Sequence, residues 1–136
     1  MLMAVELGKG NLAEQASDER MGQVALKGFF AIARHWKLKP GEQRTLLGDL
    51  PATTFNRYKQ LPQVALNRDL MERISYILGI HKALRILFQD ADRAYDWMHL
   101  PNDAFPFGGQ TALEFVLQGS LVRLAELRAY LDAMRG

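Results

Sequence analysis

Cysteine is absent from the sequence, which excludes disulfide bonds, thiolate metal sites and thiol nucleophiles. A chain without cysteine also suits the reducing cytoplasm. Long apolar runs are missing as well, and none approaches the roughly 20 residues that a membrane-spanning helix needs. The first residues carry charge at Glu6 and Lys9, too early for a secretory signal peptide. We therefore expect a cytoplasmic protein without a membrane segment.

A large excess of one charge is also lacking. The 136 residues have a formal net charge of +2, and apolar residues make up 49% of the chain against 24% charged residues. This balance is typical of a folded globular protein and excludes wholesale disorder. A weakly basic chain can bind nucleic acid if its positive charge is concentrated on one surface. The length is sufficient for one compact unit with a buried core.

Residues with catalytic or metal-binding chemistry form no recognisable motif. The sequence has three histidines, at His35, His81 and His99. They are far apart, and none has a metal-ligand spacing with an acidic partner, so we interpret each as a helix-end or surface residue. Asp90 and Asp92 stand where carboxylates stabilise the start of a helix. Gly108-Gly109 follows no strand and lacks the spacing of a phosphate loop. We therefore expect no enzyme activity, no cofactor and no metal.

The spacing of apolar residues predicts an all-α protein of about seven or eight helices, without a convincing strand. Residues 1–17 lack this periodicity and are expected to form a flexible leader. Ser17 or Asp18 is then expected to cap a helix that runs to about Trp36. Later helices are predicted over residues 42–48, 52–60, 67–78, 80–88, 90–98, 111–118 and 120–134, and Gly79 is expected to end one of them.

Two of these helices are short and close together, which is typical of a helix-turn-helix. Their connector, from Gly48 to Ala52, is longer than the usual short turn, and Asp49 is expected to cap the second helix. Phe55 and Tyr58 lie on one face of that helix and can pack inward. The residues that can contact DNA phosphates and bases are Arg44, Thr53, Thr54, Asn56, Arg57 and Lys59. An ordinary solvated surface is the alternative interpretation, because any exposed helix is polar.

The last helix is apolar around more of its circumference than a surface helix needs. Its leucines form one stripe from Leu121 to Leu131, and Val122, Ala129 and Tyr130 fall outside that stripe. Either neighbouring helices cover these residues within the monomer, or they serve as a dimer interface or a partner-binding groove. The sequence leaves both interpretations open.

A distinctive series of residues fills the second half of the chain. It comprises Arg73-Ile-Ser-Tyr-Ile-Leu78, Leu87-Phe88-Gln-Asp90, Ala94-Tyr-Asp-Trp97-Met98, Pro101-Asn102 and Phe107-Gly-Gly-Gln-Thr-Ala-Leu-Glu-Phe-Val-Leu-Gln-Gly119. In order and spacing, this series resembles the toxin-binding domain of Xre/MbcA/ParS-type antitoxins, which are partners of RES-domain toxins. The amino-terminal half is similar in outline to the Xre-like helix-turn-helix of that family.

The resemblance implies a two-part antitoxin, in which residues 18–62 would bind operator DNA and residues 66–136 would bind the toxin. The implied toxin is of ADP-ribosyltransferase type and consumes or transfers from NAD, and the antitoxin would cover its active site. The resemblance also implies repression of the antitoxin's own operon and a homodimer. A stand-alone dimeric helix-turn-helix transcriptional regulator is the alternative function.

The resemblance assigns two groups of residues. Those that would shape the toxin-binding domain are Trp97, Pro101, Asn102, Gly108, Gly109, Leu113 and Gly119. Those that would contact the toxin lie on the last helix and tail, and are Arg123, Arg128, Tyr130, Met134 and Arg135. We expect the first group to be structural rather than to contact the toxin.

Overall fold

The computed structural model describes the backbone of residues 2–118 and 120–136, and the side chains from Asn11 onward within these ranges. The described residues form helices and connecting loops, with one isolated bridge between Pro101 and Thr111. The elements are α1 (Leu2–His35), α2 (Pro40–Leu46), α3 (Ala52–Tyr58), α4 (Arg68–Leu87), α5 (Ala91–Asp96), the 3-10 helix η1 (Trp97–His99), α6 (Ala112–Val116) and α7 (Leu121–Arg135). The predicted all-α fold is confirmed.

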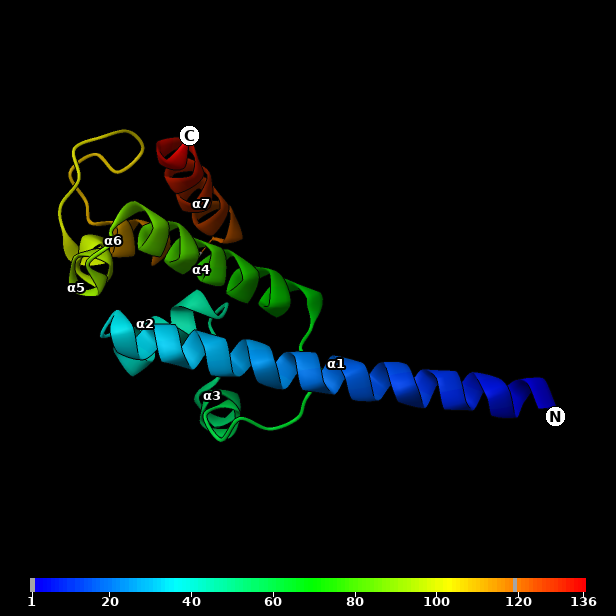
Figure 1. Ribbon diagram of the computed structural model, residues 1–136. Coiled ribbons are helices and arrows are strands. Elements are labelled where there is room, and N and C mark those ends of the chain that lie inside the picture. Colours follow the sequence, from blue (N-terminus) through cyan, green and yellow to red (C-terminus); the bar gives the residue numbers. More distant parts are fainter. Residues whose placement is uncertain (1, 119) are drawn as a thin grey trace.

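Helices α1 and α4 form the centre of the molecule. In Figure 1, α1 runs between α3 on one side and α4 on the other, and α7 covers the far side of α4. The largest fully buried side chains come from several of these elements, and include Trp36, Phe29, Ile77, Leu84 and Phe115. They belong to one continuous apolar core. The central pair therefore holds α3 and α7 on opposite sides of the molecule.

The long first helix corrects the expected flexible leader. Helix α1 begins at Leu2 and continues to His35, so Ser17 and Asp18 lie inside it and do not cap its start. Ala, Leu, Glu and Gln, which favour helix, dominate residues 2–17. Two glycines in this stretch cost about 1 kcal/mol each relative to alanine, which is not enough to end the helix. The amino-terminal part of α1 projects away from the other helices (Figure 1).

Helix α4 corrects a second boundary. It is continuous from Arg68 to Leu87, so Gly79 lies in its interior and does not end a helix. A Cβ atom at position 79 would overlap the guanidinium of Arg128 in α7. Glycine is therefore used here for the close approach of a neighbouring helix, which is one of the reasons for glycine inside a helical pattern.

Helices α4, α5, α6 and α7 each begin within one residue of a predicted start, and a side chain caps each of them. Asn67 Oδ1 accepts a hydrogen bond from the Leu70 amide at 2.8 Å, and Asp90 Oδ1 accepts one from the Asp92 amide at 2.9 Å. Thr111 caps α6 in a reciprocal arrangement with Glu114. Ser120 caps α7. Side-chain oxygens thus satisfy amides that have no partner within the helix.

Candidate DNA-binding and toxin-binding surfaces

The connector between α2 and α3 is a five-residue turn fixed from both sides. Arg44 Nε donates a hydrogen bond to the Leu50 carbonyl at 2.8 Å, and the Leu50 amide donates to the Arg44 carbonyl at 3.2 Å. Gly48 and Asp49 have φ angles of +86° and +60°. The expectation that Asp49 caps α3 is wrong, because Pro51 is the N-cap residue and no side chain caps the helix. Asp49 instead forms the left-handed part of the turn, a conformation that Asp tolerates.

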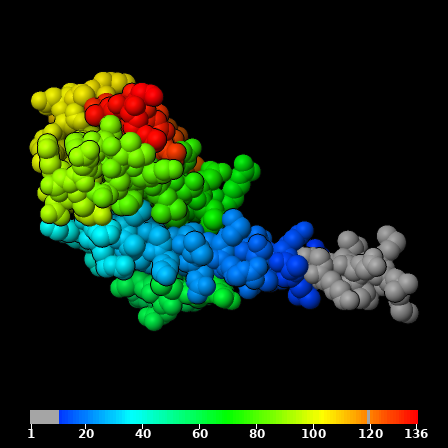
Figure 2. All heavy atoms as spheres, in the orientation of Figure 1, coloured from blue at the N-terminus to red at the C-terminus, as the bar shows by residue number. Residues whose placement is uncertain are grey.

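Helix α3 has one buried face and one exposed face. Phe55 and Tyr58 are buried, and the Phe55 ring lies 5.8 Å from that of Phe30 in α1. Among the residues predicted to contact DNA, Thr53, Asn56, Arg57 and Lys59 are exposed, whereas Thr54 and Arg44 are half-buried. The α3 segment lies on the molecular surface, at the lower edge of Figure 2. The structure therefore places four of the six predicted residues where a duplex could reach them.

Arg34 is a basic residue of this surface that sequence reasoning missed. It is exposed near the end of α1 and shares a small cleft of about 240 Å³ with Lys59, Gln43 and Phe30. Arg34 and Lys59 are 25 positions apart (59 minus 34), so their proximity has no local signal in the sequence. The cleft places Arg34 beside Lys59 and so adds a third cation to Arg57 and Lys59 of α3, where anionic phosphates would be favoured.

Helix α7 packs its leucine stripe against the core, and its arginines contact other residues of the same chain. Leu124, Leu127 and Leu131 are buried. Arg128 Nε donates to Asp132 at 3.1 Å, and Arg135 reaches the same carboxylate at 3.5 Å. The Arg123 guanidinium lies 4.4 Å from the centre of the Phe115 ring. All three arginines predicted to reach a toxin thus have intramolecular contacts in this structure.

The apolar excess of the last two helices is partly explained by the core. Phe115 and Val116 are buried, so neighbouring helices cover them within the monomer. Val122, Ala129 and Met134 are exposed. Neighbouring helices thus cover part of this apolar excess, and an exposed apolar surface remains on α7, for which a role in binding a second chain stays a prediction.

An aromatic cluster joins α7 to the loop before α6. The Tyr130 ring lies 5.0 Å from Phe107 edge to face and 6.4 Å from Trp97 in a stacked arrangement. Trp97 is half-buried at the start of η1, whereas the adjacent Met98 is fully buried. Leu113 is buried nearby.

Asn102 organises the loop over residues 100–111. Its amide donates to the Gln110 carbonyl at 3.1 Å, its carbonyl accepts from the Gly109 amide at 2.8 Å, and its Oδ1 accepts from the Ala104 amide at 2.9 Å. Gly108 and Gly109 have φ angles of +60° and +92°, which glycine adopts without steric cost. Asn102, Gly108 and Gly109 thus shape the loop, and the expectation that they do not contact the toxin stays a prediction. Gly119, the last member of that group, lies outside the described residues.

The same loop presents Phe105, which sequence reasoning did not identify. Its side chain is 92% exposed. With Pro106 it borders an apolar pocket of about 480 Å³, whose other wall consists of Glu126, Ala129 and Tyr130 of α7. An aromatic residue in a loop gives no sequence signal for exposure, since most phenylalanines are buried.

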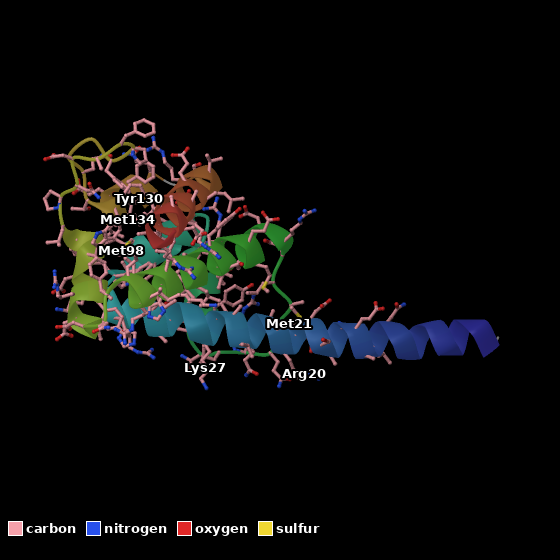
Figure 3. All side chains as sticks on the ribbon, turned by 45° about the horizontal axis from the view of Figure 1, so that its top comes forward. Arg20, Met21, Lys27, Met98, Tyr130 and Met134 are labelled. Atoms are coloured by element: carbon pink, nitrogen blue, oxygen red, sulfur yellow. The ribbon has the colours of Figure 1, made fainter. Side chains whose placement is uncertain are left out.

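A second apolar groove lies between α1 and α4. Met21 and Val24 of α1 are exposed, Val24 to 70%, and Leu78 of α4 is partly exposed beside them. Together with Ser17, Arg20, Ala25 and Met71, they line a groove of about 360 Å³. Figure 3 labels Met21 on α1, near the point where the chain rises to α4. Contiguous exposed apolar side chains of this kind mark interaction surfaces.

Two histidines meet where α1, α4 and α5 come together. The His35 ring stacks on Tyr95 at 4.4 Å, and the His81 ring lies 5.9 Å from Tyr95. Burial lowers the pKa of His81, and the nearby His35 and Arg85 lower it further. His81 Nε2 is buried without a hydrogen-bond partner. His35 is exposed at the end of α1, as expected, whereas His81 is half-buried in the interior of α4, which corrects its interpretation as a helix-end or surface residue.

His99 connects η1 to the end of α1. Its Nε2 donates a hydrogen bond to the Trp36 carbonyl at 2.6 Å. Within residues 2–118 and 120–136, no group of three or more His, Cys, Asp or Glu side chains could hold a metal ion. In the same part of the chain, no helix has the length and apolar character needed to cross a membrane.

Comparisons with known proteins identify both halves of the chain. The family described as antitoxin Xre/MbcA/ParS C-terminal toxin-binding domain matches residues 83–136, and the antitoxin Xre-like helix-turn-helix domain matches residues 15–79. An uncharacterized protein, y4oB, of Sinorhizobium fredii is 44% identical over 121 residues, which cover 89% of this chain and 92% of that protein. No solved structure matches. The predicted resemblance is confirmed, and the chain belongs to the Xre/MbcA/ParS family of antitoxins.

Proposed function

We propose that this protein neutralises a RES-domain toxin in the cytoplasm by covering the toxin's active site, and that it represses its own operon as a homodimer. The observation that carries the proposal is the exposed apolar end of α7, inside the segment that matches a toxin-binding domain. Leu131 is fully buried, whereas the three following residues, Asp132, Ala133 and Met134, are exposed. The end of α7 is therefore anchored by the core and extends beyond it.

The contacts of the arginines divide them into two roles. Arg135 pairs with Asp132 at the protein surface, where such a pair contributes about 0–1 kcal/mol. Arg135 can exchange that partner for an acidic group of the toxin at little cost. Arg128 also lies against Gly79, so its guanidinium packs α7 onto α4. Its role is therefore to hold the exposed end of α7 in place. Tyr130 and Met134 are one helical turn apart and share a face of α7.

A short deletion tests the steric mechanism. Removal of residues 134–136 takes away Met134 and Arg135 but leaves the buried Leu131 in place. We expect this variant to fold with an unchanged melting temperature and to lose protection in a growth assay with the co-expressed RES toxin. A deletion after Arg128 is unsuitable, because loss of a buried leucine costs about 2–5 kcal/mol. Full protection by the short deletion would refute occlusion by the tail.

Operator binding is the second part of the proposal. Phe55 and Tyr58 anchor α3 in the core and leave Asn56, Arg57 and Lys59 exposed. Asn can read adenine edges, and Arg and Lys can bind guanine or phosphate. The helix-turn-helix match supports DNA binding by this part of the chain. Repression follows if the bound site overlaps the promoter of the antitoxin's operon, which a reporter assay would measure.

We place the dimer interface at the groove between α1 and α4. Its apolar residues Met21, Val24 and Leu78 all lie within the helix-turn-helix match at 15–79. Proteins of this class bind two half-sites as symmetric dimers, so the DNA-binding half needs a self-complementary surface. A second copy of α1 would cover the exposed Val24 side chain.

A stand-alone dimeric regulator is the second candidate function. The exposed face of α3 and the groove between α1 and α4 would serve it equally well. Co-expression with the product of a neighbouring RES-domain gene, followed by affinity purification, separates the two functions. A complex that restores growth supports the antitoxin, and absence of a complex favours the regulator.

A further inference from the structure

We propose that Phe105 is the principal anchor of the toxin complex, and that the pocket beside it takes an apolar toxin side chain next to a basic one. This inference rests on the proposed antitoxin function and adds a contact that lies outside α7. It starts from the exposure of Phe105, which at 92% is the most exposed large apolar side chain among the described residues.

The loop that carries Phe105 is held by hydrogen bonds within the chain. Asn102 holds both ends of it through bonds to Gln110, Gly109 and Ala104, at distances between 2.8 and 3.1 Å. The Phe107 amide also donates to the Ala104 carbonyl at 2.8 Å. An aromatic side chain on a preorganised loop loses little conformational entropy when it binds. Aromatic residues of this kind are enriched among the few that dominate binding energy.

The pocket next to Phe105 defines what the partner must present. Its apolar lining includes Pro106, Ala129 and Tyr130, and Glu126 of α7 also lines it. Tyr130 is held by Phe107 and Trp97, so this lining is rigid. A complementary surface therefore inserts one apolar side chain into the pocket and places a Lys or Arg within reach of the Glu126 carboxylate.

The position of this surface favours the toxin over a second copy of the chain. Phe105 and every residue that lines the pocket lie within the toxin-binding match at 83–136. A second apolar groove, at Met21 and Val24, lies within the helix-turn-helix match. Two separate apolar surfaces, one in each matched segment, fit a protein that binds both a toxin and a second copy of itself. The Phe105 surface also adjoins Tyr130, and through it the face of α7 that bears Met134 (Figure 3).

The test uses the full-length protein and the purified RES-domain protein encoded by the neighbouring gene, titrated by calorimetry. Phe105→Ser should raise the dissociation constant by at least about 30-fold, which is the effect of losing one dominant anchor. Glu126→Lys should raise it by at least about 10-fold, because it reverses the charge at the pocket. Val122→Ser is the matched control, since Val122 is exposed at the other end of α7, and it should change binding less than about 3-fold.

The outcomes separate this inference from the proposed function. If the wild-type protein binds the toxin, and Phe105→Ser binds it as tightly as Val122→Ser does, Phe105 is not the anchor. The antitoxin function would still stand. Weak binding by Phe105→Ser with unaffected binding by Glu126→Lys would overturn the basic partner group. Failure of the wild-type protein to bind would refute the antitoxin function, and the anchor with it. Thermal unfolding of each variant checks the fold, which an exposed substitution at position 105 should leave unchanged.

Discussion

The guanidinium of Arg128 lies against Gly79, so that α7 approaches α4 at a residue without a side chain. A glycine in the middle of a 20-residue helix costs about 1 kcal/mol relative to alanine. The position of Arg128 explains why this cost is tolerated. The basic side chain also pairs with Asp132 one turn further along α7, so it contacts its own helix and α4 at once.

Substitution of three glycines should give three different changes in stability. Gly22→Ala should lower the free energy of unfolding by about 1–3 kcal/mol, because its Cβ would overlap the backbone carbonyl of Val64, which cannot move alone. Gly79→Ala should change it by less than about 1 kcal/mol, since better helix propensity offsets displacement of the flexible Arg128. Gly41→Ala has nothing within 4 Å and should not destabilise. Urea denaturation measures all three.

The double variant Gly79→Ala, Arg128→Ala isolates the contact between those two residues. With the guanidinium removed, alanine at position 79 should show its full helix-propensity gain of about 1 kcal/mol. The two substitutions should therefore be non-additive. Additive free energies in this cycle would mean that the guanidinium does not press on position 79 in solution.

Removal of two cations from α3 should weaken operator binding. For Arg57→Ala with Lys59→Ala, we expect affinity to fall by at least about 10-fold and the salt-dependence slope to decrease by about 1 for each phosphate that is no longer neutralised. The charge-matched control is Lys82→Ala with Arg93→Ala, whose side chains are exposed on α4 and α5. A mobility-shift titration at several salt concentrations is the measurement. Equal effects of the two pairs would refute α3 as the recognition helix.

Charges in the groove between α1 and α4 should dissociate the dimer. Met21→Glu with Val24→Glu places two carboxylates where we expect a second copy to pack, so the protein should become monomeric in light scattering. Ile86→Glu with Val122→Glu is a suitable control, because these apolar side chains are also exposed but lie outside the groove. Dimers that survive the first pair and dissociate with the second would move the interface to the carboxyl-terminal half.

Stability should depend on the protonation of His81. The pKa of the folded His81 is below its ordinary value of 6.5, so the unfolded chain binds more protons as the pH falls below about 6.5. The free energy of unfolding should therefore decrease from pH 6.5 toward the folded pKa, and this contribution should be constant above pH 7.5. His81→Phe keeps a ring beside Tyr95 and should flatten the decrease. Chemical denaturation at pH 7.5 and 5.5 gives the comparison, and identical slopes in both proteins would contradict the assignment.

Local sequence signals predicted much of the fold because their causes are local. The helix starts at Asn67, Asp90, Thr111 and Ser120 were predictable, since each precedes an apolar periodic segment, and each of these residues caps a helix. The prediction that Gly79 ends a helix was wrong, because glycine is needed here to make room for the Arg128 side chain of α7, almost 50 positions away. The prediction of a flexible leader was also wrong. It gave more weight to a few glycines and polar residues in residues 2–17 than to the good helix formers around them.

The candidate surfaces were predictable to different degrees. The exposed face of α3 follows from helical periodicity alone, once Phe55 and Tyr58 are assigned to the core. Phe105 and Arg34 were missed, because exposure in a loop and proximity across 25 positions leave no pattern in the sequence. The stack of His35, Tyr95 and His81 combines three helices, which spacing in the sequence cannot reveal.

The continuous helix α4 joins the DNA-binding and toxin-binding segments and fixes the distance between them. The segments that match the helix-turn-helix and the toxin-binding domain end and begin at residues 79 and 83, inside this one helix. At 1.5 Å per residue, its 20 residues extend about 30 Å without an interruption. A toxin held at the carboxyl-terminal half would therefore turn as one body with α3. In a dimer on DNA, the distance between two half-sites would then dictate the distance between two bound toxins, so operator spacing would select which toxin arrangements can dock.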